Sequence, residues 1–99
     1  MDVDGRRFTA AGVWKPIRST RNPLAIELGQ FAVREHNRQS YAHLKFERVL
    51  EGSTQVDGPK LTVWIVIDAQ NGSSVQKYNA TILEEPWRNF KNLTSFRRV

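Results

Sequence analysis

One stretch of the chain has the hydrophobic spacing of a long helix. Asn22 followed by Pro23 is typical of a helix start, because the asparagine side chain can accept a backbone N–H and proline at the first helical position loses no hydrogen bond. We expect the helix to end near Ser40 and to lie on an apolar sheet with its charged side in water. The residues that this spacing places on one face are Leu24, Leu28, Phe31, Ala32 and Glu35, widened by Ile26 and Val33.

The segments on either side of this helix have the pattern of strands. Residues 12–17 predict a short extended segment, in which Pro16 favours an edge position because proline cannot donate to a ladder. Residues 41–50 alternate between apolar and polar until the parity changes. That change predicts a bulge or strong bend between Glu47 and Val49.

Three further strands are predicted in the second half of the chain. Residues 61–69 are apolar on most of both faces, so we expect this strand in the centre of the sheet, with Trp64 and Val66 as a patch on its uncovered side. Residues 76–83 alternate in the same way. Residues 90–96 give a last short strand whose expected core residues are Leu93 and Phe96.

The connections between these strands are rich in turn-forming residues. The stretch from Gly52 to Pro59 predicts a hairpin connection, and Asn71-Gly72 predicts a tight turn because both residues accept positive φ cheaply. Residues 85–89 break the pattern again before the last strand. One helix followed by strands and tight turns indicates an α+β fold, an antiparallel sheet of four to five strands wrapped around one helix.

Length and composition allow one domain. The chain has 99 residues, of which 39% are hydrophobic, and this is enough for one small core. Residues 1–11 are polar and basic without a period, so we interpret them as a flexible N-terminal arm and residues 12–99 as the folded domain.

Charge and hydropathy narrow the classes of partner. The net charge is +5, but the basic residues are scattered, whereas a nucleic-acid footprint normally needs a contiguous stripe; nucleic acid stays a minor hypothesis. No apolar run approaches the roughly 18 residues of a membrane span, and the N-terminus lacks the hydrophobic region of a signal peptide. We therefore expect no membrane partner, and either a cytoplasmic protein or a secreted one whose leader was removed.

The residues give little support for an enzyme, a metal site or a cofactor. There is no cysteine, and His36 and His43 have no clear carboxylate pair with which to bind a metal. The serines lie mainly in turns, without a nucleophile-elbow or phosphate-loop motif. Three triplets match the N-glycosylation pattern, at Asn71, Asn79 and Asn92, and they matter only if the chain is secreted.

Five separated motifs, in order along the chain, resemble those of the plant cystatins, inhibitors of papain-like cysteine peptidases. The resemblance covers about residues 12–99. Its central motif is the helix segment Leu28 to Asn37. The other four are Gly12 to Ile17, Leu44 to Val49, Gln55 to Gly58, and Pro86 to Phe90 followed by Leu93 to Phe96.

The resemblance implies reversible, competitive inhibition by a wedge that enters the peptidase cleft without offering a cleavable bond. The wedge would consist of an N-terminal trunk and two hairpin loops, which suit this role where they are small and rigid. Trp87 would be the main anchor, because a large aromatic side chain adds much contact at low entropic cost. The peptidase-binding residues carried over by position are Gly12 and Val13 in the trunk, Gln55, Val56, Asp57 and Gly58 in the first loop, and Pro86 and Trp87 in the second.

Two positions differ from the family's pattern. Its first loop normally reads Gln-x-Val-x-Gly, and this chain is one residue shorter there; its trunk usually has two adjacent glycines, and Val13 stands in place of the second. These differences suggest an alternative, a cystatin-fold interaction module with lost or weakened inhibition that binds a partner near Trp64. For the oligomeric state we expect a monomer or a dimer that exchanges its helix and strand by opening the first loop.

Overall fold

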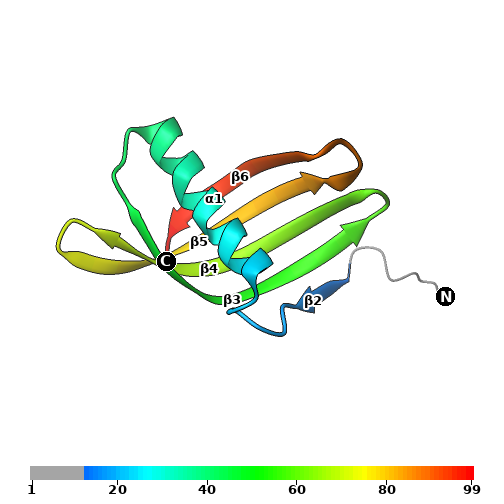
Figure 1. Cartoon of the computed structure of the whole chain (residues 1–99), viewed down its shortest axis with the longest axis horizontal. Coiled ribbons are helices and arrows are strands. Elements are labelled where there is room, and N and C mark those ends of the chain that lie inside the picture. Colours follow the sequence, from blue (N-terminus) through cyan, green and yellow to red (C-terminus); the bar gives the residue numbers. More distant parts are fainter. Residues whose placement is uncertain (1–12) are drawn as a thin grey trace.

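The computed structural model describes residues 13–99, and in this range one helix lies across one face of a five-stranded antiparallel sheet (Figure 1). The strands pair in the order in which they occur in the chain. The predicted fold class is confirmed, whereas the expected arm 1–11 and Gly12 lie outside the described residues. The elements are β2 Trp14–Pro16, α1 Pro23–Ser40, β3 Lys45–Asp57, β4 Lys60–Asn71, β5 Ser74–Glu85, the 3-10 helix η1 Pro86–Arg88, and β6 Phe90–Arg98.

Helix α1 begins and ends as the sequence predicts. Asn22 Oδ1 accepts a hydrogen bond from the backbone N–H of Leu24 at 2.8 Å, with Pro23 in the first turn. The helix ends at Ser40, and Tyr41 follows in the left-handed conformation with φ 57°. The side chain of Asn37 then pairs with both the backbone N–H and the carbonyl oxygen of Leu44, at 3.0 and 2.9 Å, which ties the helix end to the approach of β3.

The helix faces the sheet with most of the predicted side, slightly rotated: Ala32 and Val33 are buried and Leu28 and Phe31 pack against the core, as expected. Leu24, expected on the buried face, is 68% exposed, and the buried helix residues are Ala25, Gly29, Ala32 and Val33. A Cβ at Gly29 would lie 2.4 Å from Phe46 Cε1, so the ring of Phe46 occupies the space that a side chain there would need. The small residues allow the helix to approach the sheet closely, and this close contact determines its rotation.

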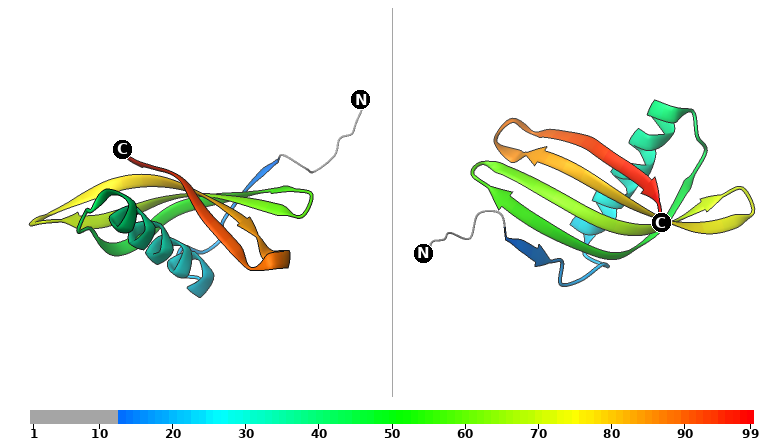
Figure 2. Two further views of the ribbon diagram at one scale, coloured as in Figure 1. Left: turned by 90° about the horizontal axis from the view of Figure 1, so that it is seen from above. Right: turned by 180° about the vertical axis from the view of Figure 1, so that it is seen from behind.

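The core lies between the helix and the concave face of the sheet. Figure 2 shows the helix on one side of the sheet and the other face uncovered. β4 is the middle strand of the sheet, as predicted, and Phe96 of β6 packs against the core as expected. The side chains that fill the core are mainly Ala32 and Val33 from α1, Val49 from β3, Val63, Ile65, Ile67 and Ala69 from β4, Tyr78, Ala80 and Ile82 from β5, and Leu93 from β6.

Strand β3 confirms one prediction and corrects another. Its register with β4 shifts between Phe46 and Arg48, where a bulge was predicted, and again between Val49 and Glu51. The hairpin connection predicted over residues 52–59 is much shorter in the structure. Residues 52–57 continue the strand, because each of them finds a partner on β4, and only two residues form the turn.

Candidate functional site

One end of the sheet brings together most of the residues predicted to bind a peptidase. The β3–β4 turn, the β5–β6 loop and the start of β2 all lie at the right-hand end of Figure 1, away from the β4–β5 hairpin and the C-terminus. The strand register explains this, since Trp14 at the start of β2 pairs with Gln55 near the end of β3. We call this end of the molecule the loop edge.

The first loop of the loop edge is a two-residue turn. Asp57 pairs with Lys60, so only Gly58 and Pro59 lie between the strands. Gly58 has φ +60°, and Pro59 fixes its own φ near −65°, a combination that suits a type II′ hairpin turn. Of the four predicted first-loop residues, Gln55, Val56 and Asp57 are therefore strand residues and only Gly58 belongs to the turn.

Exposure differs among these residues. Val56 is 54% exposed, and Asp57 and Gly58 are exposed as well, whereas Gln55 is half-buried within the sheet. A Cβ on Gly58 would meet nothing within 4 Å. The tip of the first loop is thus narrow, apolar at Val56 and free of neighbouring side chains at the glycine.

The second loop of the loop edge is η1 and its flanks. Glu85 pairs with Phe90 to close the hairpin, and Asn89, in the left-handed conformation with φ 52°, donates its backbone N–H to Pro86 O at 3.1 Å. Trp87 sits between these fixed points and is 63% exposed. The turn is therefore closed by its backbone, while its one tryptophan projects into solvent.

Two residues that the sequence patterns did not single out hold the second loop. Glu85 is 7% exposed, and Arg88 Nε donates a hydrogen bond to Glu85 Oε1 in an ion pair. The guanidinium of Arg88 lies 4.3 Å from the ring centroid of Phe90 and 5.5 Å from that of Trp87. Opposite charges three residues apart on either side of Pro86-Trp87 were the sequence signal that could have found this pair.

The third part of the loop edge is the beginning of the described chain. Val13 is 50% exposed and precedes β2, which is an edge strand as Pro16 predicted. Gly12, the other predicted trunk residue, lies outside the described residues. The structure thus places Val13, Val56, Gly58 and Trp87 on one edge, all of them exposed.

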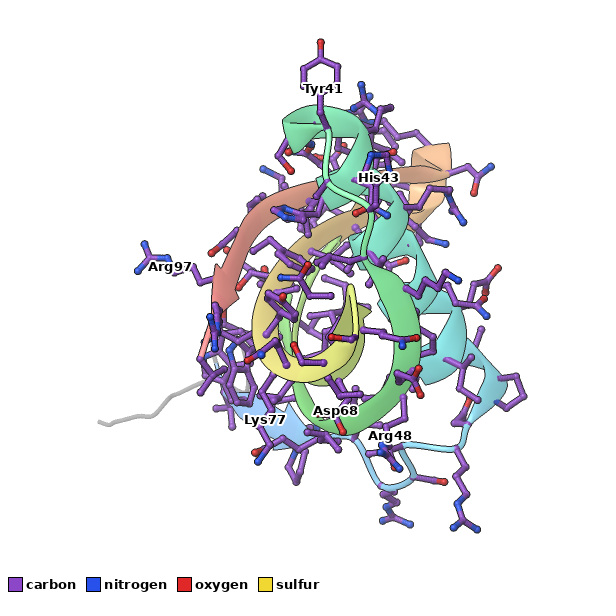
Figure 3. All side chains as sticks on the ribbon, turned by 90° about the vertical axis from the view of Figure 1, so that its left-hand side faces the viewer. Tyr41, His43, Arg48, Asp68, Lys77 and Arg97 are labelled. Atoms are coloured by element: carbon purple, nitrogen blue, oxygen red, sulfur yellow. The ribbon has the colours of Figure 1, made fainter. Side chains whose placement is uncertain are left out.

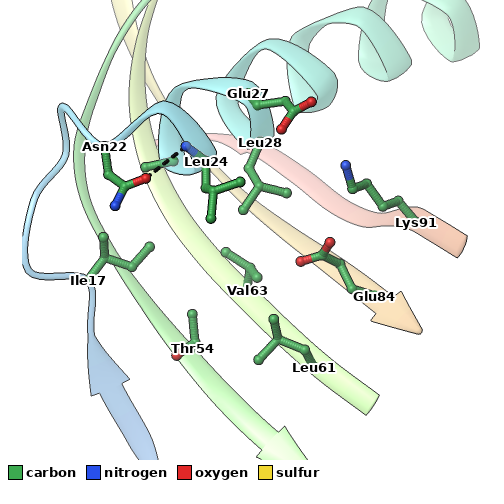
Figure 4. A pocket seen from close by; sticks show the side chains of 11 residues that line it. Ile17, Asn22, Leu24, Glu27, Leu28, Thr54, Leu61, Val63, Glu84 and Lys91 are labelled. Atoms are coloured by element: carbon green, nitrogen blue, oxygen red, sulfur yellow. Dashed lines mark hydrogen bonds between the residues drawn. The ribbon is translucent and has the colours of Figure 1, made fainter. Parts of the chain in front are cut away.

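Beside the loop edge a cleft opens between the start of α1 and the sheet (Figure 4). It has a volume of about 310 Å³ and is lined mainly by aliphatic side chains, among them Leu24, Leu28 and Leu61. Glu84 and Lys91 supply charge. The described lining residues include no histidine, so the cleft lacks the usual base for nucleophilic catalysis.

The uncovered face of the sheet differs from the predicted patch. Val66 is only 9% exposed, and Trp64 is half-buried, so the two do not form a broad apolar surface. Trp64 instead lines a shallow hollow together with Trp14 and the hydroxyl residues Ser53, Thr62 and Thr81. This hollow lies on the face opposite α1.

The end of the molecule opposite the loop edge carries several basic side chains (Figure 3). Arg48 is paired with the buried Asp68 through Nε and Oδ2 at 3.0 Å, whereas Arg97 projects into solvent. Within residues 13–99 no three histidine or acidic side chains cluster in a way that could hold a metal ion. In the same range no helix has the length and apolar character needed to cross a membrane.

Known proteins match nearly the whole chain. Residues 17–99 match the sequence profile of a family described as aspartic acid proteinase inhibitor. The chain is 41% identical to cysteine proteinase inhibitor 1 of Actinidia chinensis over 98% of its own length and 83% of that protein. It is 42% identical to cysteine proteinase inhibitor 5 of Arabidopsis thaliana, over 86% of this chain and 70% of that protein.

A solved structure has the same fold at lower identity. The salivary cystatin of the soft tick Ornithodoros moubata superposes with a TM-score of 0.75 at 19% identity, covering 87% of this chain and 95% of the tick protein. The helix-on-sheet arrangement is thus that of a cystatin, and the sequence relatives add the plant branch. The chain belongs to the plant cystatin family, whose members are proteinase inhibitors and not enzymes.

Proposed function

We propose that the chain inhibits papain-like cysteine peptidases reversibly and competitively by inserting its loop edge into the active-site cleft. The observation that carries this proposal is Trp87, a 63% exposed aromatic ring on a turn whose backbone is closed by hydrogen bonds. Val13 and the Gly58-Pro59 turn lie at the same edge. A row of small, ordered, exposed segments matches what a narrow cleft can accept with little entropy lost on binding.

The division of roles follows from the side chains. Trp87 provides the large apolar contact, as aromatic hot spots do in other interfaces. The first loop contributes Val56 and a glycine tip that adds no bulk. Gly12 and Val13 would guide the trunk along the cleft. The wedge would cover the catalytic cysteine without offering it a cleavable bond, so the peptidase is blocked and not supplied with a substrate.

Titration of papain tests the proposal directly. We expect stoichiometric or near-stoichiometric loss of activity with a competitive dependence on a peptide substrate, and recovery of activity on dilution. Papain that keeps full activity at high micromolar inhibitor would refute the proposed function. The inhibitor from Actinidia with 41% identity serves as the positive control for the assay.

A second target class is supported by one observation. The family profile that matches residues 17–99 is described as aspartic acid proteinase inhibitor. Titrating pepsin in parallel with papain separates the two possibilities, and the Trp87→Ala variant then tells whether the same edge is used. Inhibition of pepsin alone would replace the papain-like target in this proposal.

The rival hypothesis is an interaction module that has lost inhibition. Its surface would be the hollow formed by Trp14 and Trp64 on the uncovered face. It predicts that a partner protein still binds the Trp87→Ala variant and no longer binds a Trp64→Ala variant. Our proposal predicts instead that Trp87→Ala weakens binding to papain and that Trp64→Ala does not.

A further inference from the structure

The conformation of the second loop depends on one side-chain cluster. Glu85 ends β5 with a carboxylate whose side chain is only 10% exposed, and a buried carboxylate is costly unless a partner compensates it. Within residues 13–99 the ion-pair partner of Glu85 is Arg88. The pair spans Pro86 and Trp87, so this side-chain contact closes the same turn that the backbone hydrogen bond from Asn89 N–H to Pro86 O closes.

Arg88 also contacts both aromatic rings of the loop. Its guanidinium lies over Phe90 at 4.3 Å from the ring centroid and 5.5 Å from the centroid of Trp87, both within the range of a cation–π contact. The planar group can stack on a ring while its edge donates to a carboxylate, which an ammonium group cannot do. Arg88 therefore connects the buried carboxylate with both rings.

We propose that Arg88 is a positioning residue for inhibition, which holds η1 so that Trp87 is presented to the peptidase in its bound conformation. The side chain of Arg88 is 50% exposed, but its contacts run inward, to Glu85 and Phe90. Arg88 thus acts by restricting the motion of Trp87 in the free protein, before the peptidase binds. The part of this inference that concerns affinity rests on the proposed function, whereas the order of the loop does not.

The first experiment measures loop order without a peptidase. The chain has three tryptophans, and Trp14→Phe with Trp64→Phe leaves Trp87 as the only reporter. In this background we expect the fluorescence anisotropy decay of Trp87 to gain a larger fast component when Arg88 is changed to methionine. The Arg88→Lys variant keeps the charge without the planar group. Its fast anisotropy component should be larger than that of the Arg88 protein and smaller than that of Arg88→Met.

The second experiment measures inhibition of papain through a double-mutant cycle. Arg88→Met leaves the carboxylate of Glu85 buried without its partner, and we expect the inhibition constant to rise roughly tenfold. Glu85→Gln removes that charge. The double variant should therefore lose less than the product of the two single losses, since the uncompensated charge is then gone.

Arg97→Met is the matched control, because it removes the same charge from a side chain that projects into solvent at the opposite end (Figure 3). We expect it to change neither the anisotropy nor the inhibition constant. Melting temperatures of all variants show whether any loss reflects global unfolding. Arg88→Lys provides the comparison if Arg88→Met is too unstable to assay.

The outcomes separate the alternatives. Faster Trp87 motion together with a non-multiplicative cycle supports the positioning role. Unchanged Trp87 motion with weaker inhibition would overturn it, and a loss that grows at low salt would then indicate direct contact between Arg88 and the peptidase. If the wild-type chain fails to inhibit papain, the proposed function fails, but the anisotropy result still decides whether Arg88 orders the loop.

Discussion

The two hairpin connections of the loop edge reach rigidity by different means. The first has two residues, a glycine with φ +60° and a proline, and a side chain at Gly58 would contact nothing within 4 Å. The second has a 3-10 turn in which Glu85, Arg88 and Phe90 contact one another. Backbone restraint alone fixes the first loop, whereas in the second loop side-chain contacts add to the backbone hydrogen bond from Asn89 to Pro86.

The two loops should therefore respond differently to substitution. A loop fixed by the backbone is sensitive to the residue in the turn itself and indifferent to its surroundings. A loop fixed by side chains can be loosened from positions that never touch the partner. The first loop has little surface to offer beyond Val56, so the binding energy should come mainly from the second.

The largest expected effect comes from truncating the anchor. Trp87→Ala should weaken inhibition of papain about thirtyfold or more, since aromatic anchors at interfaces contribute about 2 kcal/mol or more. The melting temperature should stay nearly constant because the ring is 63% exposed in the free protein. Inhibition constants and thermal unfolding measure the two quantities.

Val56→Ala in the first loop is the matched comparison. It removes an exposed apolar side chain from the other hairpin, and we expect a loss smaller than about tenfold. Equal losses for the two variants would contradict a dominant second loop, because the first loop would then contribute as much to binding as the second.

An intermediate effect is expected from the turn glycine. Gly58→Ala places a Cβ on a residue with φ +60°, which should lower the free energy of unfolding by about 1 kcal/mol and also weaken inhibition. Denaturant unfolding measures the free energy of unfolding, and papain titration measures the inhibition constant. Size-exclusion chromatography shows whether the altered turn promotes a dimer.

Gly72→Ala is the control at the far end of the sheet. Gly72 has φ +65°, and a Cβ added there would, as at Gly58, meet nothing within 4 Å, so the stability loss should be similar. Inhibition should be unchanged, because Gly72 lies in the β4–β5 hairpin away from the loop edge. If both variants inhibit equally well, the first loop does not reach the cleft.

The smallest effect concerns the C-terminal part of α1, away from the loop edge. The ring of His36 stacks on Phe96 with centroids 4.1 Å apart, and burial lowers the pKa of His36 below its ordinary value. The folded state therefore binds this proton less readily than the unfolded chain does. Stability should be complete above about pH 6.5 and decrease as the pH falls through that value, levelling off below the lowered pKa.

His36→Gln should remove this part of the pH dependence, and His43→Gln, at an exposed position, should not. Melting temperatures between neutral and mildly acidic pH measure the change, which we expect to be smaller than that of the glycine variants. Inhibition at a fixed pH should be the same for both variants. A loss of inhibition with His36→Gln would mean that the loops depend on the helix end after all.

Local residue chemistry accounts for much of the fold. The start of α1 follows from Asn22-Pro23, the turn at Gly72 from its neighbour Asn71, and the bulge in β3 from a parity change, because each depends on a few adjacent residues. The order of motifs along the chain was also sufficient to identify the resemblance to the plant cystatins. These features need no knowledge of distant contacts.

Three other features depend on contacts between residues that are distant in the sequence. Helix α1 turns Ala25 and Gly29 toward the sheet and leaves Leu24 exposed, because close approach to Phe46 outweighs the larger apolar side chain. The first loop shrinks to two residues because residues 52–57 find partners on β4. The Glu85–Arg88 pair forms because the hairpin buries that carboxylate, and burial is a property of the assembled fold and not of the local sequence.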